Sequence, residues 1–204
     1  MMFSVIVPTH NGADRIRTAL DSVREQSFTD YELIVVCDAC EDGTAQIARE
    51  YGANVIEVNC RRDGLARNYG LNAATGEWVL FLDDDDRFLH EYVFQQLAEV
   101  VGKHGEDILN FSFIWKGKGY MRQTMEEQYV MCWCRCWRRE FIGDERFNLM
   151  EYHSDNYFFK KMLHMKPGIV FWDMPMYYYN YMRKGSLTDR WKRKEVAGGK
   201  GIIF

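Results

Sequence analysis

The sequence lacks the features that mark membrane-spanning and exported proteins. No apolar run approaches the ~20 residues that a membrane-spanning helix needs. The chain enters an apolar segment at residues 3–7 without the basic, alanine-bounded leader of a signal peptide. We therefore expect a cytoplasmic protein with no transmembrane segment, and we leave open a peripheral contact with the inner face of a membrane.

A second C-x-x-C motif and a histidine pair with zinc-finger spacing are also missing. The single C-x-x-C motif runs from Cys37 to Cys40, so thiol or zinc chemistry remains an alternative. Cysteines of a cytosolic chain are normally reduced, and small buried side chains are their commonest role. Cys132, Cys134 and Cys136 alternate, which is typical of one face of a strand.

Internal repeats and low-complexity linkers are absent, so 204 residues predict a single domain. We expect that domain to span residues 1–188 as two halves, 1–100 and 101–188, followed by a basic, mobile tail at 189–204. Charge divides in the same way, because the net charge is −10 over residues 1–100 and +6 over 101–204. An acidic half suits a cation, and a basic half suits an anion.

Apolar strand-like segments alternate with amphipathic helices through the first half. Strands are expected at 3–7, 31–37, 54–58 and 78–82, with helices between them and Gly76 ending the third helix. Such alternation predicts a parallel sheet with right-handed crossovers. In the second half the pattern predicts helices at 91–101 and 154–164 and strands at 107–115, 128–137, 169–172 and 176–181.

An acidic run follows the fourth expected strand. Residues 83–86 are four consecutive aspartates, placed where the buried strand at 78–82 should end. Four adjacent like charges repel, and hard divalent cations prefer carboxylate oxygens. Ligands of open parallel sheets bind beyond the carboxyl ends of the strands. The run therefore indicates a metal site at the mouth of the sheet, with a solvated acidic turn as the alternative.

In their order and spacing these motifs resemble the family 2 inverting glycosyltransferases of GT-A fold. The resemblance is carried by residues 4–11, 22–36, 66–77, 83–86 and, more loosely, 178–188. It implies an α/β fold with a Rossmann-like, mostly parallel sheet flanked by helices and a mixed acceptor-side half. Residues 1–100 would bind a nucleotide-diphospho-sugar, and residues 101–188 would bind the acceptor. The sequence departs from the family pattern at Cys37, Cys40 and Ser154.

The resemblance also implies roles for residues of the donor half. Asp38 would accept the N3–H of a uracil ring, with a helix cap as the alternative. Pro8 and His10 would line the same pocket, although His10 would equally suit a satisfied loop position. Arg67 would meet a ring carbonyl or a phosphate, or else pair with an acidic neighbour.

The resemblance implies a different role for each of the aspartates at positions 83, 84 and 85. Asp83 would contact the ribose or the water shell of the metal, and Asp84 would help to hold the nucleotide. Asp85 would contact Mg²⁺ or Mn²⁺ directly, and that ion would bridge the two phosphates of the donor.

An inverting transfer needs a base on the face of the sugar opposite the leaving group. Asp155 matches the late carboxylate of the family, with the N-cap of the helix at 154–164 as its alternative. The second half also offers Asp144, Glu145 and Glu151, and His153 is a weaker candidate. The predicted function is metal-dependent transfer from a UDP-sugar to an acceptor hydroxyl, and the alternative is a non-catalytic nucleotide-sugar-binding protein. A saccharide, a lipid-linked sugar, a protein and a nucleic-acid base are all open as acceptors, and the basic run at 190–194 would suit a polyanion or an anionic membrane.

Overall fold

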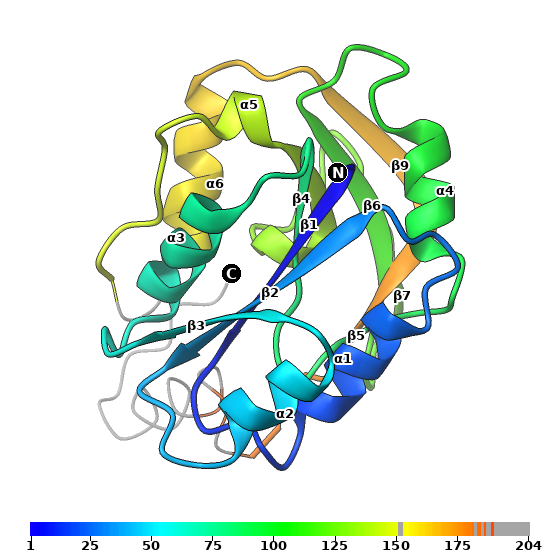
Figure 1. The fold of residues 1–204 in the computed structure, drawn as a ribbon. Helices are drawn as coiled ribbons and strands as arrows, with labels where there is room; N and C mark the ends of the chain where they lie inside the picture. The colour runs from blue at the N-terminus through cyan, green and yellow to red at the C-terminus, as the bar shows by residue number, and fades with distance from the viewer. Residues whose placement is uncertain (151–152, 182, 185, 187–188, 190–204) are drawn as a thin grey trace.

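The computed structural model of the protein describes residues 1–150, 153–181, 183, 184, 186 and 189. Its centre is one mixed sheet with the strand order β3-β2-β1-β4-β8-β6-β9-β5, and β7 pairs with β6 beside this path. Helices cover both faces of the sheet (Figure 1). The predicted basic tail lies outside the described residues except for Asp189. In the described part of the chain no helix is both long enough and apolar enough to cross a membrane.

The first half forms the parallel part of the sheet, as the sequence predicted. Its parallel strands are β1 (Phe3–Thr9), β2 (Tyr31–Asp38), β3 (Asn54–Val58) and β4 (Trp78–Phe81), and they pair with one another in parallel. Every residue of β1 is buried, which explains its nearly continuous apolar sequence. Because the strands are parallel, their carboxyl ends meet at one edge, and this edge carries the candidate site.

Three helices connect these strands: α1 (Ile16–Arg24), α2 (Thr44–Glu50) and α3 (Asp63–Ala73). The buried positions of α1 recur every three or four residues, so one stripe of the helix faces the sheet. α3 packs across β1 and β2 and lies beside α6 (Ser154–His164), whose bounds agree with the prediction (Figure 1). The remaining helices are α4 (Val93–Val100) and the short α5 (Arg139–Ile142).

The second half completes the sheet with strands of both directions. They are β6 (Ile108–Trp115), β7 (Gly119–Met121), β8 (Arg135–Arg138) and β9 (Ile169–Tyr179). The short β5 (Arg87–Phe88), at the end of the first half, pairs antiparallel with β9. β8 runs antiparallel between β4 and β6, and β9 runs parallel to β6. The two strands expected at 169–172 and 176–181 are one strand, because register shifts opposite Ser112 absorb the interruption between them.

Two other local predictions were wrong. Only Arg135–Arg138 of the expected strand at 128–137 is extended, and Cys132–Cys134 form a 3₁₀ turn, η1. The cysteines at 132, 134 and 136 are buried but do not share one strand face. Gly76 does not end α3, whose C-cap is Ala74 in an extended conformation. A Cβ at Gly76 would lie 2.6 Å from the backbone nitrogen of Ser4, so close packing, not a helix terminus, requires glycine there.

The contact between α3 and β1 depends on Gly70. A Cβ at this position would overlap Cγ2 of Ile6, which is fully buried. We expect Gly70→Ala to lower the free energy of unfolding by about 1–3 kcal/mol, the usual cost of overpacking a core. Urea denaturation of the wild type and the variant measures this difference in the free energy of unfolding. Gly43→Ala is the control, because its Cβ would meet no atom within 4 Å. Equal losses in the two variants would contradict the packing argument.

Candidate active site

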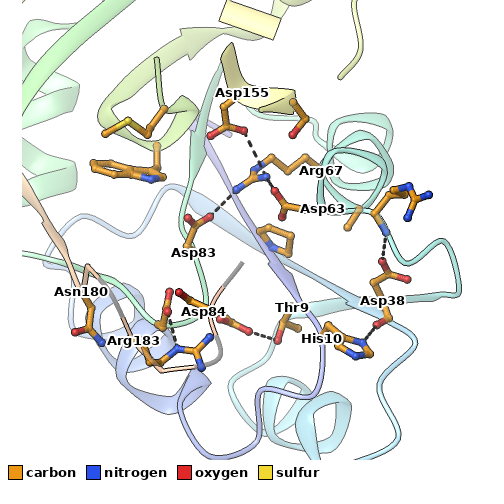
Figure 2. A pocket seen from close by; sticks show the side chains of 18 of the residues that line it. Thr9, His10, Asp38, Asp63, Arg67, Asp83, Asp84, Asp155, Asn180 and Arg183 are labelled. Atoms are coloured by element: carbon orange, nitrogen blue, oxygen red, sulfur yellow. Dashed lines mark hydrogen bonds and ion pairs between the residues drawn. The ribbon is translucent and has the colours of Figure 1, made fainter. Parts of the chain in front are cut away.

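A cavity of about 800 Å³ opens at the carboxyl edge of the parallel strands (Figure 2). Its walls come from both halves of the chain. The first half contributes the ends of β1, β2 and β4 and the start of α3, and the second half contributes residues 130, 131, 133, 153–156 and part of 179–186. All of the site residues that the sequence predicted line this cavity: Pro8, His10, Asp38, Arg67, Asp83, Asp84, Asp85 and Asp155.

Asp38 organises one end of the cavity. Its Oδ1 accepts hydrogen bonds from the backbone amides of Cys60 and Arg61, both at 2.8 Å, and its Oδ2 accepts one from Arg62 at 2.9 Å. The helix-cap alternative was wrong, because Asp42 bonds the amide of Thr44 at the start of α2. A carboxylate oxygen has two acceptor sites, so Asp38 keeps acceptor capacity beyond these three bonds.

His10 lies beside Asp38 at the same end of the cavity. Its Nδ1 is 2.6 Å from the carbonyl oxygen of Asp38, so the ring is held in position by one nitrogen (Figure 2). Pro8, two residues earlier in β1, also lines the cavity and has no amide hydrogen. The carboxyl ends of β1 and β2 therefore bring an imidazole ring, a proline and an acceptor carboxylate to this end of the cavity.

Two carboxylates of the acidic run, Asp84 and Asp86, are held by buried contacts within the protein, and Asp84 also lines the cavity. Asp84 accepts bonds from Thr9 Oγ1 at 2.5 Å and from Arg15 Nη2 at 2.7 Å, and Asp86 accepts one from the Tyr177 hydroxyl at 2.8 Å. Burial raises the pKa of both carboxyl groups. The alternative of a solvated acidic turn was wrong. Asp84 lines the cavity with both carboxylate oxygens already bonded, to Thr9 and Arg15.

Arg67 joins the acidic run to the second half of the chain. It is 2% exposed, and its Nη2 bonds Asp83 Oδ1 at 2.7 Å. Its Nη1 pairs with Asp63 and lies 3.6 Å from Asp155 Oδ1 (Figure 2). The acidic pair left open for Arg67 is therefore present, with three partners. Asp63 was missed by the sequence reasoning, although its position four residues before Arg67 on one helix was a usable signal.

These neighbours perturb the titration of Asp83. Withdrawal from bulk water raises the pKa of its carboxyl group to about 8; the Arg67 guanidinium opposes this rise, and the nearby Asp63, Asp155 and Asp85 carboxylates add to it. In the absence of a further cation, burial and the neighbouring carboxylates therefore disfavour the ionised form of Asp83. A cation arriving there would be stabilised by the field of these groups.

Asp155 is brought to the cavity by the first turn of α6. The N-cap of this helix is His153, which has a left-handed backbone with φ of 63°, so the N-cap alternative for Asp155 was wrong. Asp155 Oδ2 accepts the backbone amide of Cys132 at 3.3 Å, whereas Oδ1 has no hydrogen-bond partner in the structure. Figure 2 shows this carboxylate directed towards Arg67 and the cavity. One oxygen is therefore positioned by an amide, and the other is buried beside Arg67 without a hydrogen bond.

The carboxylates suit a cation that shares its ligands with a bound molecule. Within the described ranges, no group of three or more His, Cys, Asp and Glu side chains could hold a metal ion alone. Asp83 and Asp85 both line the cavity, and Asp85 Oδ2 accepts a bond from Arg183 Nε at 2.6 Å. One or two carboxylates completed by phosphate oxygens is the usual coordination of Mg²⁺ and related ions. The donor set therefore fits such an ion. Arg183 was missed by the sequence reasoning.

Trp133, Tyr177 and the cysteines of the C-x-x-C motif mainly make packing contacts within the protein. Trp133 stacks on Tyr177 with ring centroids 4.4 Å apart, and both rings are buried. Cys37 is buried and Cys40 is half-buried, and both are free thiols. A hydrogen bond from Cys37 lowers the pKa of Cys40 to about 7. Cys40 Sγ accepts the amide of Asn11 at 3.4 Å, so the pair supports the loop after β1.

Comparisons with known proteins agree with this geometry. The model of "Glycosyl transferase family 2" matches residues 4–167. Glycosyltransferase GlyA of Streptococcus pneumoniae is 26% identical over an alignment of 223 positions, which covers 94% of this chain and 32% of that protein. The chain therefore spans about a third of the length of this relative.

Solved structures resemble the chain over most of its length. The complex of Staphylococcus aureus TarS 1–349 with UDP is 26% identical, with a TM-score of 0.75, and the match covers 87% of this chain and 60% of that one. A mannosyltransferase of Pyrobaculum calidifontis, solved with GDP-Man and Mn²⁺, has a TM-score of 0.75 at 19% identity over 98% of this chain and 65% of that one. The last likeness concerns the fold alone. The fold is GT-A, and this prediction is confirmed.

Proposed function

The chain belongs to glycosyl transferase family 2, and on that basis we propose that it transfers a sugar from a UDP-sugar to an acceptor hydroxyl with inversion at the anomeric carbon. The observation that carries the proposal is the meeting of two groups of carboxylates in one cavity. Asp83 and Asp85 enter it from the end of β4, and Asp155 enters it from α6. The 26% identical S. aureus protein that was solved with UDP supports the choice of nucleotide.

The end of the cavity near Asp38 would bind the uracil ring. Asp38 would accept its N3–H, and Pro8 and His10 would line the pocket around the ring. Adenine offers a ring nitrogen without a hydrogen at the corresponding edge, so an acceptor carboxylate there favours uracil. The ribose would lie towards Asp83, and the diphosphate would lie towards Asp85.

A divalent ion, Mn²⁺ or Mg²⁺, would be held by Asp85, with Asp83 contributing directly or through water. When bound, it would offset the negative charge that develops on the departing diphosphate. Asp84 and Asp86 would keep the run in place through the contacts with Thr9 and Tyr177.

Asp155 would act as the general base. The acceptor oxygen would form a bond to the anomeric carbon while the bond from that carbon to the phosphate oxygen breaks, and UDP would leave with the electron pair. The acceptor proton would pass to Asp155 Oδ1, the oxygen without a hydrogen bond in the structure. A saccharide, a lipid-linked sugar, a protein or a nucleic-acid base could supply the hydroxyl. The reaction would take place in the cytoplasm, and the protein could contact the inner face of a membrane there.

Donor selection tests the proposal. A ligand that binds only the native state raises stability, by about 2.7 kcal/mol at a concentration of 100 Kd. In a thermal-shift screen of nucleotide-sugars with Mn²⁺, we expect UDP-sugars to raise Tm most. Asp38→Ala should weaken UDP binding by ~1–3 kcal/mol, the scale of a hydrogen bond to a charged group, and should leave the weaker ADP binding unchanged.

The control for this variant is Asp42→Ala, which removes another loop carboxylate, the one that bonds the amides of Ala13 and Thr44. It should not change the preference for UDP over ADP. Far-UV circular dichroism monitors folding, because Asp38 also anchors three amides. An equal loss of UDP and ADP binding in Asp38→Ala would show that Asp38 supports the loop and does not read the base.

A further inference from the structure

The carboxylate assigned to the cation already has a cationic partner in the donor-free protein. Arg183 Nε donates to Asp85 Oδ2 at 2.6 Å, and the two side chains are 28% and 15% exposed. The residues are 98 positions apart in the chain, so the fold and not local sequence creates the pair. Both line the same cavity, and Figure 2 shows Arg183 beside the acidic run.

We infer that Arg183 is an internal counter-cation, which occupies Asp85 until a divalent ion and the diphosphate of the donor displace it together. The inference rests on the proposed function and deepens it, since it concerns how the ion is admitted to that site. Arg183 would be a positioning residue, because it acts on the ion through Asp85.

The contacts of the neighbouring arginines indicate that Arg183 is the one able to leave. Arg67 has a side chain that is 3% exposed and pairs with three carboxylates. The Arg15 side chain is 17% exposed, and it bonds Asp84 and also the carbonyl oxygens of His10 and Asn11. Within the described part of the chain, Arg183 contacts one carboxylate and makes a longer hydrogen bond from Nη1 to the carbonyl oxygen of Lys184 at 3.3 Å. Among these three arginines it is therefore the most exposed and the least constrained.

Charge balance then couples the ion to the donor. A divalent ion at Asp85 and the Arg183 guanidinium would repel each other, and the ion alone would leave that guanidinium without its counter-ion. The diphosphate brings negative charge that compensates both cations. Ion and donor should therefore bind as a pair with positive coupling, which for allosteric and linked sites typically amounts to 5–150-fold in affinity.

Direct measurement of Mn²⁺ binding tests the inference, with electron paramagnetic resonance of free Mn²⁺ as the readout. We expect Arg183→Gln to bind Mn²⁺ without nucleotide on the order of 10-fold more tightly than the wild-type chain. Adding UDP should strengthen Mn²⁺ binding by the wild type much more than by Arg183→Gln. Arg183→Lys keeps a cation at this position and should resemble the wild type.

Lys184→Gln provides the matched control, because it removes one positive charge from the adjacent exposed residue and leaves the Arg183–Asp85 pair in place. Its Mn²⁺ affinity should equal that of the wild type. Mn²⁺ binding by Arg183→Gln that is no tighter than the wild type, or equal gains in Arg183→Gln and Lys184→Gln, would overturn the inference. The readout is ion binding, so the result stands whether or not the chain transfers sugar.

Failure of the underlying metal assignment has a different signature. Asp85→Asn should lose the UDP-dependent binding of Mn²⁺ if Asp85 holds the ion. Retained UDP-dependent binding in that variant would place the ion elsewhere and would overturn both the metal assignment and the inference. A chain whose Mn²⁺ binding follows the expected pattern, but which transfers no sugar, would contradict only the proposed function.

Discussion

Asp85→Asn is expected to abolish the stimulation of turnover by Mn²⁺ and to lower turnover by at least ~100-fold. A bound ion contributes several kcal/mol of charge stabilisation in the transition state, and each ~1.4 kcal/mol corresponds to a factor of ten. The substitution keeps the volume of the side chain and removes its charge. Asp85 pairs with the half-exposed Arg183 and not with the core, so the fold should be preserved. Release of UDP from a UDP-sugar, measured across a Mn²⁺ titration, checks the prediction.

Asp14→Asn is the control for a simple loss of charge near the cavity. Asp14 is 81% exposed and pairs with Arg15, which also bonds Asp84. Asp14→Asn removes one negative charge, as Asp85→Asn does, but leaves the cavity carboxylates unchanged, so Mn²⁺ stimulation should persist. Stimulation by Mn²⁺ that persists in Asp85→Asn would disprove the assignment of Asp85.

The parallel part of the fold could be predicted because its signals are local. Each of β1 to β4 is a short apolar run bounded by turn residues, and β3 and α6 begin and end where the sequence predicted. The strand at 169–179 was divided wrongly because its continuity depends on register shifts against β6, which the sequence of β9 does not encode alone. Gly76 was misread for the same reason: its close neighbour is Ser4, 72 residues earlier.

The site shows the same limit at the level of single charges. The acidic run predicted a group of carboxylates, but not that Asp84 and Asp86 would be bonded by Thr9 and Tyr177. Contacts such as Arg183 with Asp85 join segments that only tertiary packing brings together. The family resemblance indicated which carboxylates to examine, and the structure adds which arginine each of them meets.

Asp155→Asn tests the assignment that separates an enzyme from a nucleotide-sugar-binding protein. A correctly placed general base contributes ~10²–10⁴-fold to the rate, and we expect turnover to fall by that factor. UDP affinity should stay nearly unchanged, because the base would not touch the nucleotide and an interaction made only in the transition state affects kcat. Asn can still accept the amide of Cys132 through its Oδ1, so the start of α6 should keep its position. Steady-state kinetics and UDP titration of the same preparation give both quantities.

Glu145→Gln is the matched control for this variant. Glu145 also belongs to the second half, and it pairs with Lys161 of α6 and not with the cavity arginine. Its removal should leave both turnover and UDP affinity close to those of the wild type. Full transfer activity in Asp155→Asn would transfer the role of base to another carboxylate, first Glu151, which lies outside the described residues. A parallel loss of turnover and UDP affinity would instead assign Asp155 to support of Arg67 and Asp83, because its Oδ1 lies 3.6 Å from that guanidinium. Only the selective loss of turnover identifies Asp155 as the group that takes the acceptor proton.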